Sequence, residues 1–61
     1  MNAKEVLKIL YAKGFSQVSQ KGSHLKLSNE DKKVIVPVHG TKDIPIGTLR
    51  SIEKQSGVKL R

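Results

Sequence analysis

Residues 24–38, HLKLSNEDKKVIVPV, decide the fold because they predict two adjacent β-strands. Leu25 and Leu27 alternate with polar residues, which is the period of a strand with one buried face. The segment Lys33–Val38 is rich in β-branched residues, which favour strands. We therefore predict an antiparallel hairpin closed by a four-residue loop at 29–32. Counting outward from this loop gives the pairs Ser28–Lys33, Leu27–Val34, Lys26–Ile35, Leu25–Val36 and His24–Pro37.

A third strand is expected over Phe15–Gln20, joined to the hairpin by a tight turn at Lys21–Gly22. This turn places Val18 opposite Leu25, so both independent turns agree on one apolar face. The apolar face is expected to carry Val18, Leu25, Leu27, Val34, Val36 and Val38. The opposite face is expected to carry Gln17, Ser19, His24, Lys26, Ser28, Ile35, Pro37 and His39.

Amphipathic helices are predicted on both sides of the strands. Asn2 and Glu5 have the spacing of a capping box, so a helix is expected over residues 3–13. A second helix is expected over residues 45–56, with Gly57 as its stop signal. Its apolar stripe is Ile46, Leu49 and Ile52. The fold class is therefore α+β, with the order α-β-β-β-α, a three-stranded antiparallel sheet and both helices on one face. Residues 1–61 are expected to form a single domain.

Composition limits the function. The chain has 61 residues, 12 Lys+Arg against 5 Asp+Glu, a net charge of +7 and no cysteine. The length excludes a large enzyme, and the lack of cysteine excludes disulfides and thiolate chemistry. The basic excess favours a polyanionic or acidic partner. No apolar run reaches the roughly 20 residues that cross a bilayer, and no signal peptide is evident. We expect a cytoplasmic protein with no membrane partner.

Both histidines fall on the predicted uncovered face. His24 and His39 would be diagonal neighbours with Cα atoms about 7–8 Å apart. Lys21 and Lys26 lie nearby, and Lys42 follows in the next loop. Imidazoles that exchange protons, beside a cation that offsets phosphate charge, can cleave RNA without a metal or another cofactor. The alternative is that both histidines are ordinary surface residues.

Three segments together resemble the HicA toxin family, from about Val6 to Val58. They are Lys21-Gly22-Ser23-His24, then Val34-Ile35-Val36-Pro37-Val38-His39, then Ile44-Pro45-Ile46-Gly47-Thr48-Leu49-Arg50-Ser51-Ile52. The resemblance implies a fold like that of double-stranded-RNA-binding domains, and an mRNA-cleaving ribonuclease toxin of a type II toxin–antitoxin pair.

The same resemblance implies site residues and partners. It assigns catalysis to His24 and predicts a HicB-like antitoxin that covers the active face. Where many members have a second histidine or another polar residue, this chain has Leu25. A catalytic part for His39 comes from the predicted geometry. Contacts to RNA are expected from Lys21, Ser23, Lys26 and Lys42.

Two other functions are open from the sequence. The charge and topology also fit a non-catalytic module that binds double-stranded RNA by shape. They also fit a subunit whose basic surface binds an acidic protein. An exposed strand edge would also allow two copies of the chain to pair as a homodimer. Tyr11 either offers a stacking surface for a base or packs at the edge of its helix.

Overall fold

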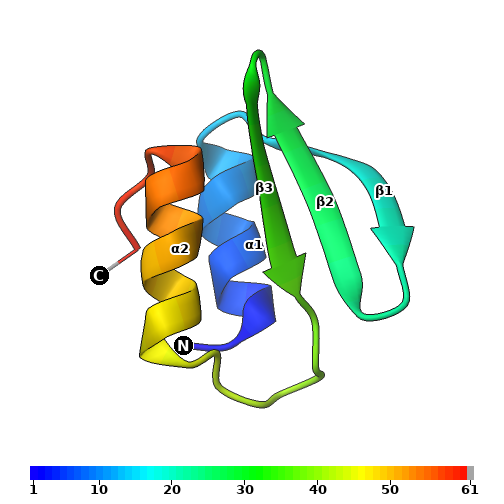
Figure 1. The fold of residues 1–61 in the computed structure, drawn as a ribbon, viewed down its shortest axis with the longest axis vertical. Helices are drawn as coiled ribbons and strands as arrows, with labels where there is room; N and C mark the ends of the chain where they lie inside the picture. The colour runs from blue at the N-terminus through cyan, green and yellow to red at the C-terminus, as the bar shows by residue number, and fades with distance from the viewer. Residues whose placement is uncertain (61) are drawn as a thin grey trace.

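The chain folds as helix, three strands and helix, as predicted. The structure is a computed structural model that describes residues 1–60. Its elements are α1 (Ala3–Ala12), β1 (Ser16–Lys21), β2 (His24–Asn29), β3 (Lys32–Pro37) and α2 (Ile46–Ser56). The strands form one antiparallel sheet in the order β1-β2-β3. Both helices lie on one side of the sheet, near β3, and β1 lies farthest from them (Figure 1).

The predicted capping box begins α1. The Glu5 amide donates to Asn2 Oδ1 at 3.0 Å, and the Asn2 amide donates to Glu5 Oε1 at 2.9 Å. These two bonds satisfy donors that the first turn of a helix leaves unpaired. After α1, Gly14 has a φ of 97°, and the buried Phe15 donates its amide to the Leu10 carbonyl. The helix therefore begins where the sequence predicts, and it ends one residue earlier than predicted, with Lys13 as its C-cap.

The register of the β2–β3 hairpin is confirmed residue by residue. Leu27 lies opposite Val34, Lys26 opposite Ile35, and His24 opposite Pro37. The ladder continues to the pair Asn29–Lys32, so the predicted four-residue loop is in fact a two-residue turn. Glu30 adopts a φ of 57° in that turn. The additional pair shortens the loop, and the residues of β2 and β3 still lie on the faces of the sheet that were predicted for them.

The predicted pairing of β1 with β2 is wrong. Lys21 lies opposite His24, so Gly22 and Ser23 form the turn, and Gln20 lies opposite Leu25. Glycine suits this turn because Gly22 has a φ of 59°, a value that few other residues adopt without strain. The turn lies one residue further along the chain than predicted. Each residue of β1 near the turn therefore pairs with a residue of β2 that lies two positions beyond the predicted partner.

A β-bulge between Gln17 and Ser19 then displaces the start of β1. Val18 is the extra residue and is 58% exposed. The prediction that Val18 belongs to the apolar face is therefore wrong. Beyond the bulge Gln17 lies opposite Leu27, a residue of the helix side, so its predicted place on the uncovered face is also wrong. Ser19 keeps its predicted face because it pairs with Lys26.

The core lies between the helices and the sheet. Its largest fully buried side chains are Leu10, Leu27, Ile52, Val6, Val34, Val36 and Ser56. Ile46 was expected in this core but is 55% exposed, and Ile44 is buried in its place. Ile46 is the first residue of α2, directly after the N-cap Pro45, and the buried residues of this helix begin only at Leu49. Leu49 and Ile52 are buried as predicted.

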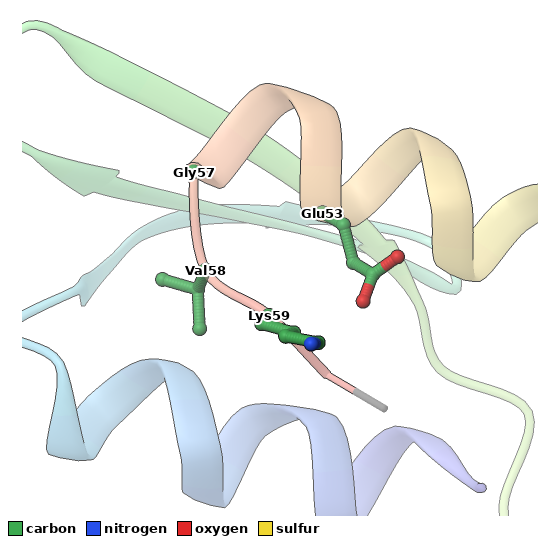
Figure 2. Close-up of a pocket in the computed structure, with 4 residues that line it drawn as sticks. All are labelled: Glu53, Gly57, Val58 and Lys59. Atoms are coloured by element: carbon green, nitrogen blue, oxygen red, sulfur yellow. The ribbon is translucent and has the colours of Figure 1, made fainter.

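The segment after α2 completes the core. Gly57 ends the helix with a φ of 73°, and Val58 and Leu60 are buried among residues of both helices. The Ser56 hydroxyl donates to the Ile52 carbonyl at 2.7 Å and accepts from the Val58 amide at 3.1 Å. Figure 2 shows this segment running beside α2, with α1 on its other side. The helix side of the sheet is therefore closed, and the opposite side is open.

Candidate active site

The uncovered face of the sheet gathers basic side chains around one histidine. Cross-strand neighbours point to the same side of a sheet, so Lys21 and His24 share this face, and Ser19, Lys26 and Ile35 share it as well. A shallow hollow of about 350 Å³ lies among them and is lined by Ser19, Lys21, His24, Lys26 and Ile35. We call this hollow the open-face site.

His24 is the first residue of β2 and its side chain is exposed. The alternation of β2 explains its direction, because the next residue, Leu25, is buried on the helix side. Among residues 1–60, no hydrogen bond or ion pair that the structure contains involves the imidazole. The ring is therefore accessible to a substrate on the uncovered face.

The charges around His24 are all positive. Lys21 lies directly across from it, and Lys26 is two residues along the same strand, on the same face. No carboxylate lines the open-face site. The ion pair found within residues 1–60 joins the amino group of Met1 to Asp43 and leaves both lysines unpaired. Uncompensated ammonium groups attract phosphate, and they stabilise negative charge that develops on it.

Ile35 adds an apolar surface to the open-face site. It is 42% exposed and lies opposite Lys26. An exposed branched side chain beside a histidine and two lysines offers contact to the flat, uncharged part of a nucleotide. The open-face site therefore combines positive charge with an exposed aliphatic surface.

The other predicted site residues lie outside this hollow. Ser23 is in the β1–β2 turn, and its carbonyl accepts the Val38 amide at 2.6 Å, one step beyond the end of β3. His39 follows and is exposed, and its carbonyl accepts the Lys42 amide at 3.2 Å within the loop that leads to α2. The structure therefore brings Lys21, His24 and Lys26 together, and it places His39 and Lys42 in the loop beyond the sheet.

One pairing in the open-face site was not predicted from the sequence. Lys21 was assigned to a turn, whereas it is the cross-strand partner of His24. The signal that could have found this is the dipeptide Gly22-Ser23, because a two-residue hairpin turn favours glycine at its first position.

A second hollow lies at the C-terminal end of α2. It has a volume of about 420 Å³ and is lined by Glu53, Gly57, Val58 and Lys59 (Figure 2). The Glu53 carboxylate there already accepts the Leu60 amide at 2.8 Å, so it holds the segment after α2 in place. This contact gives the hollow a structural explanation.

Within residues 1–60, no three side chains of the His, Cys, Asp or Glu type are grouped so that they could hold a metal ion. Neither helix of this part of the chain is long and apolar enough to cross a membrane.

Comparison with known proteins points to one family. The family model described as "HicA toxin of bacterial toxin-antitoxin" matches residues 3–58. A relative from Pseudomonas fluorescens (strain Pf0-1), named "Probable mRNA interferase HicA", is 39% identical over 59 residues. The alignment covers 97% of this chain and 98% of that protein. The match includes all five elements of the fold and every residue of the open-face site.

Proposed function

Because this chain belongs to the HicA toxin family, we propose that it is a ribonuclease toxin that cleaves mRNA, with His24 as its proton-transferring residue. The name of the Pseudomonas relative supports the activity. The observation that carries the proposal is the cross-strand pair of Lys21 and His24 on the uncovered face of the sheet. It puts an accessible imidazole next to a cation, with a second cation at Lys26.

The proposed reaction uses the 2′-hydroxyl of the RNA as its nucleophile. That oxygen attacks the adjacent phosphorus, and the 5′-oxygen of the next nucleotide leaves. His24 exchanges a proton with one of these two oxygens, which is general acid–base catalysis. Lys21 and Lys26 offset the negative charge on the phosphorane. The second proton transfer falls to His39 or to water.

The partner that we propose is an acidic, HicB-like antitoxin. The chain carries 12 basic against 5 acidic residues, and its uncovered face is basic and shallow. A protein that covers this face blocks the approach of RNA to His24. The two outer strands offer different edges to such a partner. The Ile35 amide at the edge of β3 donates to Gln55 Oε1 of α2 at 3.4 Å, whereas β1 lies away from both helices. A homodimer through β1 remains a prediction.

The reaction products test the chemistry. Attack by the 2′-hydroxyl leaves a 2′,3′-cyclic phosphate and a 5′-hydroxyl, and it needs no metal. We expect the purified protein to cleave single-stranded RNA in the presence of EDTA and to leave these ends, as end-labelling and mass spectrometry would show. Cleavage that EDTA abolishes and that leaves a 5′-phosphate would contradict the proposed mechanism. Binding of duplex RNA with no cleavage of any RNA would favour the non-catalytic module instead.

The charge of Lys21 is expected to matter more than that of another lysine on the same face. Lys21→Gln should lower the rate constant for cleavage by about 10²-fold, the lower end of the range for a lost charge-stabilising donor, because the site is open to water. Lys33→Gln is the matched control. Lys33 lies opposite Ser28, at the far end of the face, and does not line the open-face site. Equal losses in the two variants would mean that only general charge attraction is involved.

A further inference from the structure

A third hollow, of about 420 Å³, lies between α1 and the start of the loop that follows β3. Its walls come from one face of α1 and from the residues just beyond β3. It is lined by Lys4, Leu7, Lys8, Tyr11, Val38 and Gly40. We call it the α1 groove. Its size falls within the roughly 300–1,000 Å³ typical of small-ligand sites. The open-face site does not use any of these residues.

The spacing of α1 gives the groove two parallel ridges. Residues four apart lie on the same side of a helix, so Leu7 and Tyr11 form an apolar ridge and Lys4 and Lys8 a charged one. Tyr11 is 44% exposed, although it is the larger of the two aromatic side chains of the chain. Val38 provides an apolar wall across from α1. The groove therefore presents an aromatic ring and apolar walls beside two cations.

The charges of this groove are uncompensated. No carboxylate lines it, and neither lysine takes part in an ion pair within residues 1–60. The nearest acidic residue of α1, Glu5, accepts the Asn2 amide in the capping box. An occupant must therefore bring a flat apolar group to Tyr11 and negative charge to Lys4 and Lys8. A nucleotide has both, as a base and a phosphate.

We propose that the α1 groove binds one unpaired base of the RNA substrate against Tyr11, with the adjoining phosphate at Lys4 and Lys8. This inference rests on the proposed function and adds a second contact site for the same strand. The groove is short and has one exposed ring, which fits a single nucleotide better than the several anchors, one helical turn apart, of a docked helix.

The backbone connects the α1 groove to the open-face site. Pro37 is the partner of His24, and the next residue, Val38, lines the groove. The Val38 amide is bonded to the Ser23 carbonyl, directly before His24. A strand of RNA that passes over the end of the sheet at His39 therefore reaches both sites. In this arrangement the groove positions the strand, and the open-face site cleaves it.

The chain contains its own reporter for this contact. It has one tyrosine and no tryptophan, so its intrinsic fluorescence comes from Tyr11. The probe is a polyuridine RNA of about ten nucleotides, which spans both sites at the roughly 4–16 nucleotides that small folds bind. The protein is the His24→Ala variant, so that the RNA stays intact. We expect saturable quenching of the emission, after correction for absorption by the RNA. In the matched control, Tyr11→Phe with Ile46→Tyr, the only tyrosine stands at an exposed position of α2, and we expect no saturable quenching.

Affinity gives a second measurement. Loss of one base stacked on an aromatic ring weakens binding by between about fivefold and a hundredfold, which is the effect expected of Tyr11→Ala, and Tyr11→Phe should cost less than about twofold. Circular dichroism shows whether each variant is folded. The double variant Lys4→Gln and Lys8→Gln should lower the slope of log affinity against log salt by about 0.7 for each phosphate that the lysines no longer neutralise. The control pair, Lys54→Gln and Lys59→Gln, lies outside both sites and should leave the slope unchanged.

Three results would overturn the inference. They are equal quenching in the protein and its relocated-tyrosine control, an unchanged affinity of folded Tyr11→Ala, and quenching by an acidic partner protein but not by RNA. Failure of the proposed function is recognised separately. If the His24→Ala variant cleaves RNA as fast as the native chain, the catalytic assignment is wrong, whatever Tyr11 shows. If His24→Ala does not cleave RNA, and Tyr11→Ala cleaves it with the KM of the native chain, the groove assignment alone is wrong.

Discussion

Replacing His24 with alanine should abolish RNA cleavage, and it should abolish the growth arrest that we expect when bacteria express the native protein. General acid–base catalysis by one positioned side chain contributes about 10²–10⁴-fold, so a loss of that size is expected in the cleavage rate constant. The fold should persist, because the imidazole is exposed and has no hydrogen-bond partner within residues 1–60. The measurements are single-turnover cleavage of a labelled RNA and circular dichroism of the same sample.

The matched control is the other histidine of the chain. His39 is also exposed, but it lies beyond the sheet and does not line the open-face site. If His39 takes the second proton transfer, the pH–rate profile of the native protein is bell-shaped, and His39→Ala removes one limb. If it does not, the profile has one limb and the variant cleaves at the native rate. Native cleavage by folded His24→Ala would show that the chemistry lies elsewhere.

Replacing Leu27 with alanine should remove a large part of the free energy of unfolding. Leu27 is fully buried in the central strand, opposite Val34, and belongs to a core cluster that includes residues of both helices. A buried leucine truncated to alanine costs about 2–5 kcal/mol. A chain of 61 residues is expected to have a free energy of unfolding of only roughly 3–9 kcal/mol. Urea unfolding followed by circular dichroism should show a large fall in the transition midpoint, and RNA cleavage should fall with it.

Ile35→Ala is the control for that experiment. Ile35 is in the adjacent strand of the same hairpin but on the uncovered face, where it is 42% exposed. Its truncation should change the free energy of unfolding by less than about 1 kcal/mol, because little apolar area is lost from the core. Equal destabilisation by the two substitutions would contradict the exposed position of Ile35 and would mean that this face of the sheet is also buried in solution. The pair therefore tests which side of the sheet holds the core.

The two faces of the sheet explain why the proposed site is where it is. The helix side of the sheet holds the chain together through apolar packing. The uncovered side contributes little to stability, so it can carry Lys21, His24 and Lys26 with like charges close together. Repulsion between exposed lysines costs little in water. We therefore expect substitutions on this side to change RNA binding and cleavage much more than stability.

The β2–β3 hairpin was predictable because its signals are local and agree with one another. Leu25 and Leu27 alternate with polar residues, and the segment facing them is rich in valine. Only one register buries both sets of side chains, since a shift by one residue turns each to the other face. The capping box at Asn2 and Glu5 is equally local. The uncovered position of His24 follows from this register alone.

The register of β1 could not be obtained in the same way. Every residue of β1 is exposed, so its sequence carries no burial pattern that distinguishes one pairing from another. The position of the turn, at Gly22-Ser23, decides that Lys21 faces His24, and the bulge at Val18 decides that Gln17 faces Leu27. Ile46 shows the same limit, because its place in the helical period suits the core but the docking of α2 leaves it outside.

The order of the elements, the central hairpin and the side of the sheet on which His24 lies could all be predicted from the amino-acid sequence. They depend on the hydrophobic period and on caps that act within a few residues. The tertiary structure alone decided which lysine is the neighbour of His24, and that Tyr11 and Val38 share a groove. Tyr11 and Val38 are distant in the chain, so their juxtaposition depends on how α1 packs beside the segment after β3. Lys21 and His24 are close in the chain, but their pairing depends on where the turn falls, and the uniformly exposed residues of β1 do not mark that position.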